Sequence, residues 1–303
     1  MRVFVTGATG YIGGSVATRL RREGHQVDGL TRSPEGARRL AASGVRPVLG
    51  TLDDVAVLTD AARTADAVVN AADSDHRSAV ETLIEALAGS GKPLLHTSGS
   101  SIVGDDARGL HASDQVFAEQ DVHGGRWEPT ADKAPRVAID RLVLAAADRS
   151  VAAMVLCNSM IYGHGTGLSR DSVQIPRLVR QARDSGVVRH IGTGSNIWSH
   201  AHIDDVVDLY LRALRNPLPG AFLFVENGEA SFAEITHAIA DALDLPPARP
   251  WALESAIEEW GEEPARYALA SNSRVRGGRA RQELGWQPRH SSVTRWILGH
   301  LND

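Results

Sequence analysis

The sequence has very little lysine and cysteine. Lys92 and Lys133 are the two lysines among 32 basic residues, and Cys157 is the single cysteine. One cysteine excludes an internal disulfide, so we expect a reducing compartment and a cytoplasmic protein. No stretch approaches the roughly 18 apolar residues that span a bilayer, which excludes a transmembrane helix of ordinary length.

The sequence also lacks any block of like charge. The 32 basic residues are scattered among 37 acidic ones, and the formal net charge is −5. Nucleic acid and membrane surfaces are therefore excluded as expected partners, and small molecules remain. A chain of 303 residues, 43% of them hydrophobic, can bury the core of one large domain or two interlocked domains. These properties leave the oligomeric state open, with a homodimer as one alternative.

The first half alternates short β-rich runs with amphipathic helical patterns. The runs are "RVFVT", "QVDGLT", "RPVLG", "DAVVNAA", "PLLHTS" and "AAMVLCNS". Strands that alternate with helices predict an α/β fold with a doubly wound parallel sheet of the Rossmann type. We assign residues 1–162 to this nucleotide-binding domain and expect 187–225 to return to it. Residues 163–186 and 226–303 are expected to form a smaller, mostly helical substrate domain.

The chain starts with a strand, a glycine turn and the beginning of a helix. In "VFVTGATGYIGG", Gly7 permits the tight turn, Gly10 lets the backbone approach a pyrophosphate, and Gly13 lets the helix pack closely on the strand. The helix N-terminus then offers free N–H groups to the phosphates. Because the motif follows a strand and opens a helix, we interpret it as a dinucleotide-binding loop.

The end of the second strand indicates which dinucleotide is bound. NAD-binding proteins usually place an acid there to bind the ribose 2′-OH, whereas a 2′-phosphate requires arginine. This chain has Thr31, Arg32 and Ser33 at that end, and Asp28 lies earlier in the strand. An arginine forms charge-assisted, bidentate contacts with phosphate. The pattern favours NADP(H), with NAD as the alternative.

Six segments in order, "TGATGYIG", "VVNAAD", "HTSGSS", "NSMIYG", "SHAHIDDVVDLYLRAL" and "RARQELGWQP", carry a resemblance that spans the whole chain. The sequence resembles the extended short-chain dehydrogenase/reductases, of the NAD-dependent epimerase/dehydratase type. The resemblance implies a cofactor lying over the carboxyl ends of the strands. The implied cofactor contacts are Gly7, Thr9, Gly10, Tyr11, Ile12, Gly13, Arg32, Leu52, Ala71, Ala72, Ser98, Arg136, Ser159, Met160 and Ile161.

The proton chemistry of that family uses a tyrosine four residues before a lysine. None of the four tyrosines here has a lysine at that distance. Laying the family's helix over "DKAPRVAIDRLVL" places Asp132 at the tyrosine position and Arg136 at the lysine position. Arg136 can bond the cofactor ribose but cannot exchange a proton, because its pKa exceeds about 12. Asp132 is interpreted mainly as a solvated or capping residue, and Lys133 could approach the site if the overlay shifts.

The candidates for the missing proton donor are spread over several segments. Ser100 matches the family's active-site hydroxyl, and Tyr162 and His164 follow the sixth strand, where the fold faces substrate. With Arg136 these are the predicted catalytic residues, although Tyr162 could equally be a packing residue. His123, in the loop before the helix, is a further candidate of the same kind. His200, His202, Asp204 and Asp205 suggest a metal site, but zinc needs a third ligand with clear spacing, so we expect no metal.

The leading hypothesis is an NADP(H)-dependent oxidoreductase that acts on a small carbonyl or imine with a non-standard proton donor. Loss of a general acid typically slows a reaction about 10² to 10⁴-fold, so a substitute or an undemanding substrate is required. A redox-neutral epimerase, dehydratase or lyase on the same fold is the first alternative. A dinucleotide-binding sensor without turnover is the second. These hypotheses differ in whether NADPH is consumed.

Overall fold

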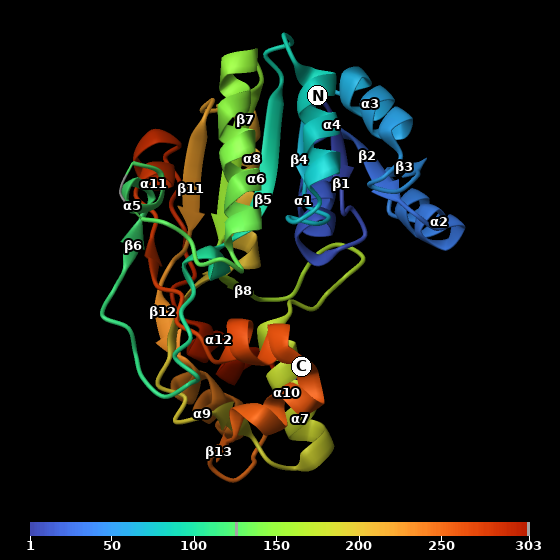
Figure 1. Cartoon of the computed structure of the whole chain (residues 1–303). Helices are drawn as coiled ribbons and strands as arrows, with labels where there is room; N and C mark the ends of the chain where they lie inside the picture. The colour runs from blue at the N-terminus through green and yellow to red at the C-terminus, as the bar shows by residue number, and fades with distance from the viewer. Residues whose placement is uncertain (125–126, 302–303) are drawn as a thin grey trace.

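Seven parallel strands form the central sheet of the molecule. The computed structural model describes residues 1–124 and 127–301, and its main sheet has the order β11-β7-β5-β4-β1-β2-β3 (Figure 1). The order runs outward from β1 in both directions, which is the doubly wound arrangement predicted from the alternating pattern. The strands are β1 Arg2–Thr6, β2 Gln26–Thr31, β3 Arg46–Leu49, β4 Ala67–Asn70, β5 Pro93–Gly99, β7 Ala152–Asn158 and β11 Ala221–Val225.

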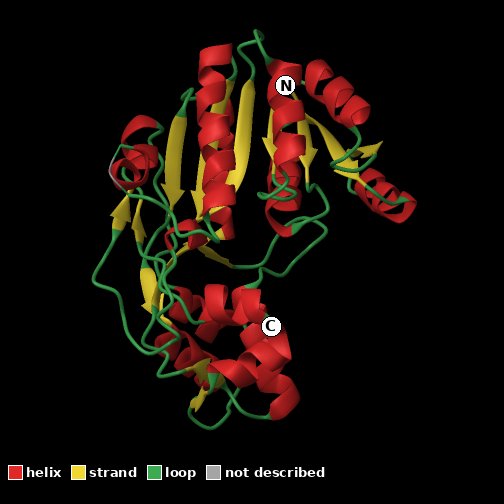
Figure 2. Ribbon diagram, in the orientation of Figure 1, coloured by secondary structure: helices red, strands yellow, loops and turns green. Residues whose placement is uncertain are grey.

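Helices cover both faces of this sheet because its strands are apolar on both sides (Figure 2). One core joins the sheet to α1, α2 and α8, and the other joins it to α3, α4 and α6. The predicted α/β fold of the Rossmann type is confirmed. These helices are α1 Tyr11–Arg22, α2 Pro34–Ala42, α3 Val55–Thr64, α4 Arg77–Leu87, α6 Ala134–Ala145 and α8 Ile203–Arg215.

A second part of the chain lies beyond the carboxyl ends of the strands, at the bottom of Figure 1. Its apolar core is separate from the two cores of the sheet and is built largely from helices. They are α7 Gln174–Ser185, α9 Phe232–Ala242, α10 Leu253–Trp260, the π-helix η3 Glu263–Leu269 and α12 Val293–His300. The remaining short helices are η1 Ser100–Val103, α5 Glu119–His123, η2 Ala146–Arg149 and α11 Arg279–Glu283.

Short strands connect the two parts. Strand β10 pairs with β8 and β12, β9 pairs with β13, and β6 pairs with β14. Their bounds are β6 Phe117–Ala118, β8 Met160–Tyr162, β9 Arg189–Ile191, β10 Ile197–His202, β12 Glu229–Ser231, β13 Arg249–Trp251 and β14 Val275–Arg276. The segment 187–225 therefore divides: α8 and β11 lie with the main sheet, whereas β9 and β10 belong to the small sheets.

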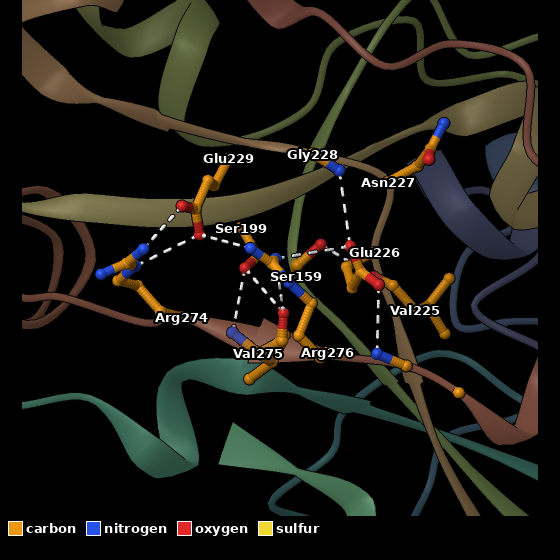
Figure 3. Close-up of polar contacts among 12 residues, drawn as sticks. Ser159, Ser199, Val225, Glu226, Asn227, Gly228, Glu229, Arg274, Val275 and Arg276 are labelled. Carbon is orange, nitrogen blue, oxygen red and sulfur yellow. Dashed lines mark hydrogen bonds and ion pairs between the residues drawn. The ribbon is translucent and has the colours of Figure 1, made fainter. Parts of the chain in front are cut away.

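Polar contacts, shown in Figure 3, attach the C-terminal segment to β12, to β10 and to the end of β11. Glu229 binds Arg274 at 2.6 Å, and the Ser199 hydroxyl accepts from the Val275 amide at 2.9 Å. Glu226, 4% exposed, accepts from the Gly277 amide at 3.1 Å and forms an ion pair with Arg281. A buried carboxylate is tolerated only when it is bonded in this way. These contacts fix residues 273–277, and with them the preceding turn of η3.

No helix in the described ranges has both the length and the apolar character needed to cross a membrane.

Candidate active site

The glycine turn after β1 has the geometry of a phosphate cradle. Gly7 has a φ of +68°, and a Cβ there would lie 2.4 Å from the backbone oxygen of Ala71. A Cβ on Gly13 would lie 2.5 Å from the Gly7 oxygen, so both positions require glycine. Helix α1 begins at Tyr11 without a side-chain cap, which leaves its first N–H groups available to an anion.

A long groove extends from this cradle along the ends of β1, β2 and β4. The Rossmann contacts predicted on the adenine side are among its lining residues. The groove is lined by Gly7, Thr9, Gly10, Leu30, Thr31, Arg32, Ser33, Glu35, Gly36, Arg39, Gly50, Thr51, Leu52, Asp53, Ala71, Ala72, Asp73 and His76. The structure thus brings together six of the predicted phosphate and adenine contacts and Arg32, and it adds Arg39, which sequence reasoning missed.

The only acid within strand β2 is unavailable to a ribose. Asp28 is 2% exposed and is bonded at 2.6 Å by both Arg2 and Arg46. Arg32 instead lies exposed at the end of the strand, and Ser33 caps α2 by accepting from the Gly36 amide. The groove therefore presents cationic Arg32 and the N-terminus of α2 at the place where NAD-binding proteins present a carboxylate.

A second cavity, of about 330 Å³, lies between the carboxyl ends of β5 and β7 and the helical part of the chain. We call it the central pocket. The predicted residues Tyr11, Ile12, Ser98, Ser100, Arg136, Ser159 and Ile161 all line it. The rest of the lining consists of residues that were not predicted as site residues: Gly99, Ser101, Asn158, Ser172, Val173, Gln174, Trp198, Glu263, Tyr267 and Ala268. Met160, 1% exposed, packs into the core of the helical part instead.

Arg136 is held on one wall of the central pocket. Its Nε donates to Asp75 Oδ1 at 2.7 Å, a second guanidinium nitrogen contacts the other oxygen of Asp75, and Nη1 donates to Ser101 Oγ at 2.9 Å. Bonding to Arg136 holds the pKa of Asp75 below its ordinary value. The guanidinium is thus fixed as a permanent donor beside the pocket, in agreement with a ribose-binding role and not with proton transfer.

A buried chain of polar side chains leads from Ser98 into the sheet. Ser98 donates to Asp140 Oδ2 at 2.9 Å, and Asp140 Oδ1 lies 3.8 Å from His96 Nε2. The Asn70 amide nitrogen lies 3.0 Å from His96 Nδ1, while the Thr6 hydroxyl donates to the Asn70 oxygen at 2.6 Å. Because Nδ1 accepts from the amide, the neutral ring carries its proton on Nε2, facing Asp140.

Burial shifts the pKa values of this pair in opposite directions. Desolvation raises the pKa of Asp140 to about 7 and lowers that of His96 to about 4. Each side chain is 1% exposed, and the two facing atoms have no hydrogen-bond partner in the described chain. A carboxyl that titrates near neutrality therefore lies directly behind a pocket serine.

Ser100 lines the central pocket, but its hydroxyl is already bonded. The side chain is fully buried, and its Oγ lies 2.7 Å from Ser273 Oγ, which itself donates to the Ser100 carbonyl at 2.8 Å. The Ser100 proton is therefore directed at Ser273. This contact joins η1 to the C-terminal segment.

Tyr162 and His164 lie outside the central pocket. The Tyr162 hydroxyl donates to the His290 carbonyl at 3.1 Å, and its ring packs edge-on against His200 and His202. His164 lines a different cavity, next to Trp296. Tyr162, the last residue of β8, packs into the core of the helical part, and the loop after it runs along α1, where the Thr166 amide donates to Ser15 Oγ at 3.2 Å. The structure therefore places neither Tyr162 nor His164 in the central pocket, contrary to the expectation that they face it.

The other titratable candidates have structural surroundings. His123 packs against Phe222 with ring centroids 4.2 Å apart. Asp132 is exposed, and hydrogen bonding from Thr130 and Lys133 lowers its pKa, so it is not held as an acid. His202 accepts from the Asp204 amide at 3.2 Å and thereby caps α8.

The histidine segment does form a cluster in space. Potential ligand atoms of His202, Asp204 and His290 lie within 4.8 Å of one another. The two imidazole rings are stacked, with centroids 4.1 Å apart and planes 25° apart. Because nitrogen lone pairs lie in the ring planes, stacked rings do not direct them at a common point, which is poor geometry for a tetrahedral metal site.

The sequence profile of the family described as "NAD dependent epimerase/dehydratase family" matches residues 3–222. The chain belongs to this family. It is 33% identical to oxidase ucsJ of an Acremonium species, over 95% of this chain and 92% of the relative. It is 28% identical to 3-diazoavenalumate denitrifying reductase of a Streptomyces species, over 96% and 97% of the two chains. Two further matching proteins are named as a reductase and a ketoreductase.

The same fold occurs in solved structures of other proteins. MoeE5 in complex with UDP-glucose and NAD superposes with a TM-score of 0.74, covering 98% of this chain and 96% of that chain at 23% identity. The likeness establishes the fold of this family member and agrees with the resemblance noted from the six segments. Family membership, together with relatives named as oxidases and reductases, identifies the chain as an enzyme of the dehydrogenase/reductase type.

Proposed function

We propose that the chain is an NADP(H)-dependent oxidoreductase that reduces a small organic carbonyl or imine in the central pocket. One observation carries the proposal: the glycine cradle and Arg32 line one groove, and the central pocket lies at the carboxyl ends of the same sheet. In open α/β sheets, ligands bind outside these strand ends. The dinucleotide would therefore lie with its adenosine end at Arg32 and its nicotinamide end at the central pocket.

The residues present fit a dinucleotide. The turn keeps its shape because a Cβ on Gly7 or Gly13 would collide with neighbouring backbone atoms. Tyr11 and Ile12, at the start of α1, line the central pocket and so connect it to the cradle. Arg136 would donate to the ribose on the nicotinamide side, and the free amides of α1 would bind the pyrophosphate. When bound, the nicotinamide supplies the hydride.

The side chains along the groove support the proposed preference for NADP(H). A 2′-phosphate at the end of β2 would contact the Arg32 guanidinium and the N-terminal turn of α2, with Arg39 on the same groove wall. Asp28 cannot bind the 2′-OH of NAD because Arg2 and Arg46 occupy both of its oxygens. The acid Glu35 also lines the groove, and Arg32 and Arg39 offset its charge.

Substitution of Arg32 tests the cofactor. A hydrogen bond to a charged group contributes about 1.5–3 kcal/mol, so Arg32→Ala should weaken NADPH binding about 10 to 100-fold and NADH binding less than about two-fold. Fluorescence titration of each nucleotide measures both constants. Arg38→Ala changes an exposed arginine on the nearby helix α2 that does not line the groove, and it is the matched control. Equal losses for NADPH and NADH would overturn the assignment of NADP(H).

Turnover tests the reaction type. Reduction predicts loss of NADPH absorbance in proportion to product when carbonyl and imine compounds are supplied. Product formation without net NADPH consumption would instead establish a redox-neutral epimerase, dehydratase or lyase. Tight NADPH binding without any turnover would establish a dinucleotide sensor.

A further inference from the structure

The central pocket contains two phenols, and they differ in what their hydroxyls contact. The Tyr11 hydroxyl donates to the Gly163 carbonyl at 2.9 Å, and this bond fixes it on the loop after β8. Tyr267 also lines the pocket, and its hydroxyl makes no hydrogen bond to any residue in 1–124 or 127–301. The other residues whose hydroxyls were candidates, Ser98 and Ser100, direct their protons at Asp140 and Ser273.

Tyr267 has a lysine beneath its ring. Lys133, 7% exposed, places Nζ 4.0 Å from the centroid of the Tyr267 ring and 3.2 Å from Asp132 Oδ2, with which it forms an ion pair. A desolvated ammonium over an aromatic face is attracted by the ring and stabilises negative charge that develops on it. Tyr267 comes from the helical part and Lys133 from the residue before α6, so no spacing along the sequence reveals the pair.

The segment that carries Tyr267 is unusual and well anchored. Residues Glu263–Leu269 form a π-helix, a conformation that is rare and frequently occurs at functional sites. Arg266 forms an ion pair with Asp106, and the Asn272 side chain donates to Asp105 at 2.9 Å. With the contact between Ser100 and Ser273, these bonds attach η3 to the segment that follows β5.

We propose that Tyr267, with Lys133 beneath its ring, is the proton donor that replaces the absent tyrosine and lysine pair. The inference rests on the proposed reductase function and assigns its acid. A carbonyl carbon gains the hydride and forms the C–H bond, the C=O π pair moves to oxygen, and that oxygen takes the Tyr267 proton. The nicotinamide is oxidised, the carbonyl is reduced to an alcohol, and the phenolate regains its proton from solvent.

The surroundings of Tyr267 keep its phenol protonated. Lys133 and Asp132 lie on one side of the ring, Glu262 and Arg266 flank it on its own segment, and Asp106 faces it from the segment after β5. Desolvation, followed by the nearby carboxylates, raises the pKa of Tyr267. The phenol is therefore protonated at neutral pH, which is the state a reduction requires.

Paired substrates test the inference with NADPH as cofactor. Acetophenone and a 1,2-diketone require a proton on oxygen, whereas N-methyl-3,4-dihydroisoquinolinium accepts hydride at carbon and requires none. Tyr267→Phe should slow ketone reduction at least about 100-fold. Reduction of the iminium should change less than about two-fold, because the acid takes no part in it. Lys133→Met should slow ketone reduction about ten-fold, the effect of losing roughly 1.4 kcal/mol of cation–π stabilisation.

Binding provides a readout that does not depend on turnover. The affinity of Tyr267→Phe for NADPH, measured by fluorescence titration, should match that of the wild-type protein, which separates loss of the acid from loss of the site. Equal slowing of ketone and iminium, or no slowing of the ketone, overturns the role of Tyr267 and leaves the reductase function standing. Wild-type activity on the iminium alone also overturns it. A wild-type protein that reduces none of the probes overturns the proposed function and this inference with it.

Discussion

The buried carboxyl of Asp140 should make the stability of the protein fall as pH rises. Its pKa is raised from 3.8 to about 7 by burial, so the native state favours the protonated form by about three pKa units. At 1.36 kcal/mol per unit, full ionisation in the native state costs up to about 4 kcal/mol. The stabilisation is fully present below pH 3.8 and is lost as pH rises through 7.

Asp140→Asn removes this titration while keeping an oxygen that can accept from Ser98. The free energy of unfolding of the variant minus that of the wild type should therefore grow by about 3 kcal/mol between pH 5 and pH 8. Any constant cost of placing an amide beside His96 cancels in this comparison, and His96 titrates in both proteins. Urea unfolding followed by tryptophan fluorescence at four pH values measures the difference.

The matched control is Asp148→Asn, an exposed aspartate just beyond the end of the same helix. A carboxylate that water reaches in both the folded and the unfolded state contributes little to the pH dependence of stability. A difference for Asp140→Asn that stays constant from pH 5 to pH 8 would refute the reasoning, because it would mean that the native protein holds Asp140 as readily ionised as the unfolded chain does.

Two further substitutions test the cofactor site. Arg136→Ala should weaken NADPH binding about ten-fold in a fluorescence titration, because one charged donor to the ribose is lost, and unchanged affinity would remove Arg136 from the site. Gly13→Ala should abolish measurable NADPH binding and lower the melting temperature, because its Cβ would lie 2.5 Å from the Gly7 carbonyl oxygen. Gly299→Ala, where a Cβ meets nothing within 4 Å, is its control, and an equal response of the two glycine variants would contradict the steric argument.

The features that could be predicted from the sequence are those formed by residues close together in the chain. The cradle around Gly7, Gly10 and Gly13 lies within one strand, turn and helix, so consecutive residues are enough to recognise it. The fold class followed from alternating apolar and amphipathic segments. The helix overlay placed Arg136 at the family's lysine position, and the structure puts this residue at the central pocket, bonded to Ser101. Each of these inferences depends on contacts between elements that are neighbours in sequence or on a pattern shared by the whole family.

What could not be predicted depends on contacts between distant segments. Tyr267 meets Lys133 across 134 positions, so a search for tyrosine and lysine at fixed spacing rejects it. The burial of Asp140 depends on His96 and Ser98 from β5, which a helix pattern does not specify. Tyr162 and His164 were misplaced because a strand end tells where the backbone points but not to which side the next turn carries it.

Arg136 explains why the acid must come from elsewhere in this chain. In the family, a lysine at that position both binds ribose and lowers the pKa of a neighbouring phenol. Arg136 is paired with Asp75, which largely neutralises its charge, so in the proposed function it would keep only the first of these two roles. Restoring the family pattern with the double variant Asp132→Tyr and Arg136→Lys would therefore add a further phenol without moving Tyr267. If Tyr267 is the acid, ketone reduction by the double variant should still require Tyr267. The exception is that the new tyrosine and lysine pair supplies the proton instead. Combining the double variant with Tyr267→Phe distinguishes these two outcomes. Ketone reduction by the triple variant would show that the new tyrosine can protonate the ketone oxygen in place of Tyr267.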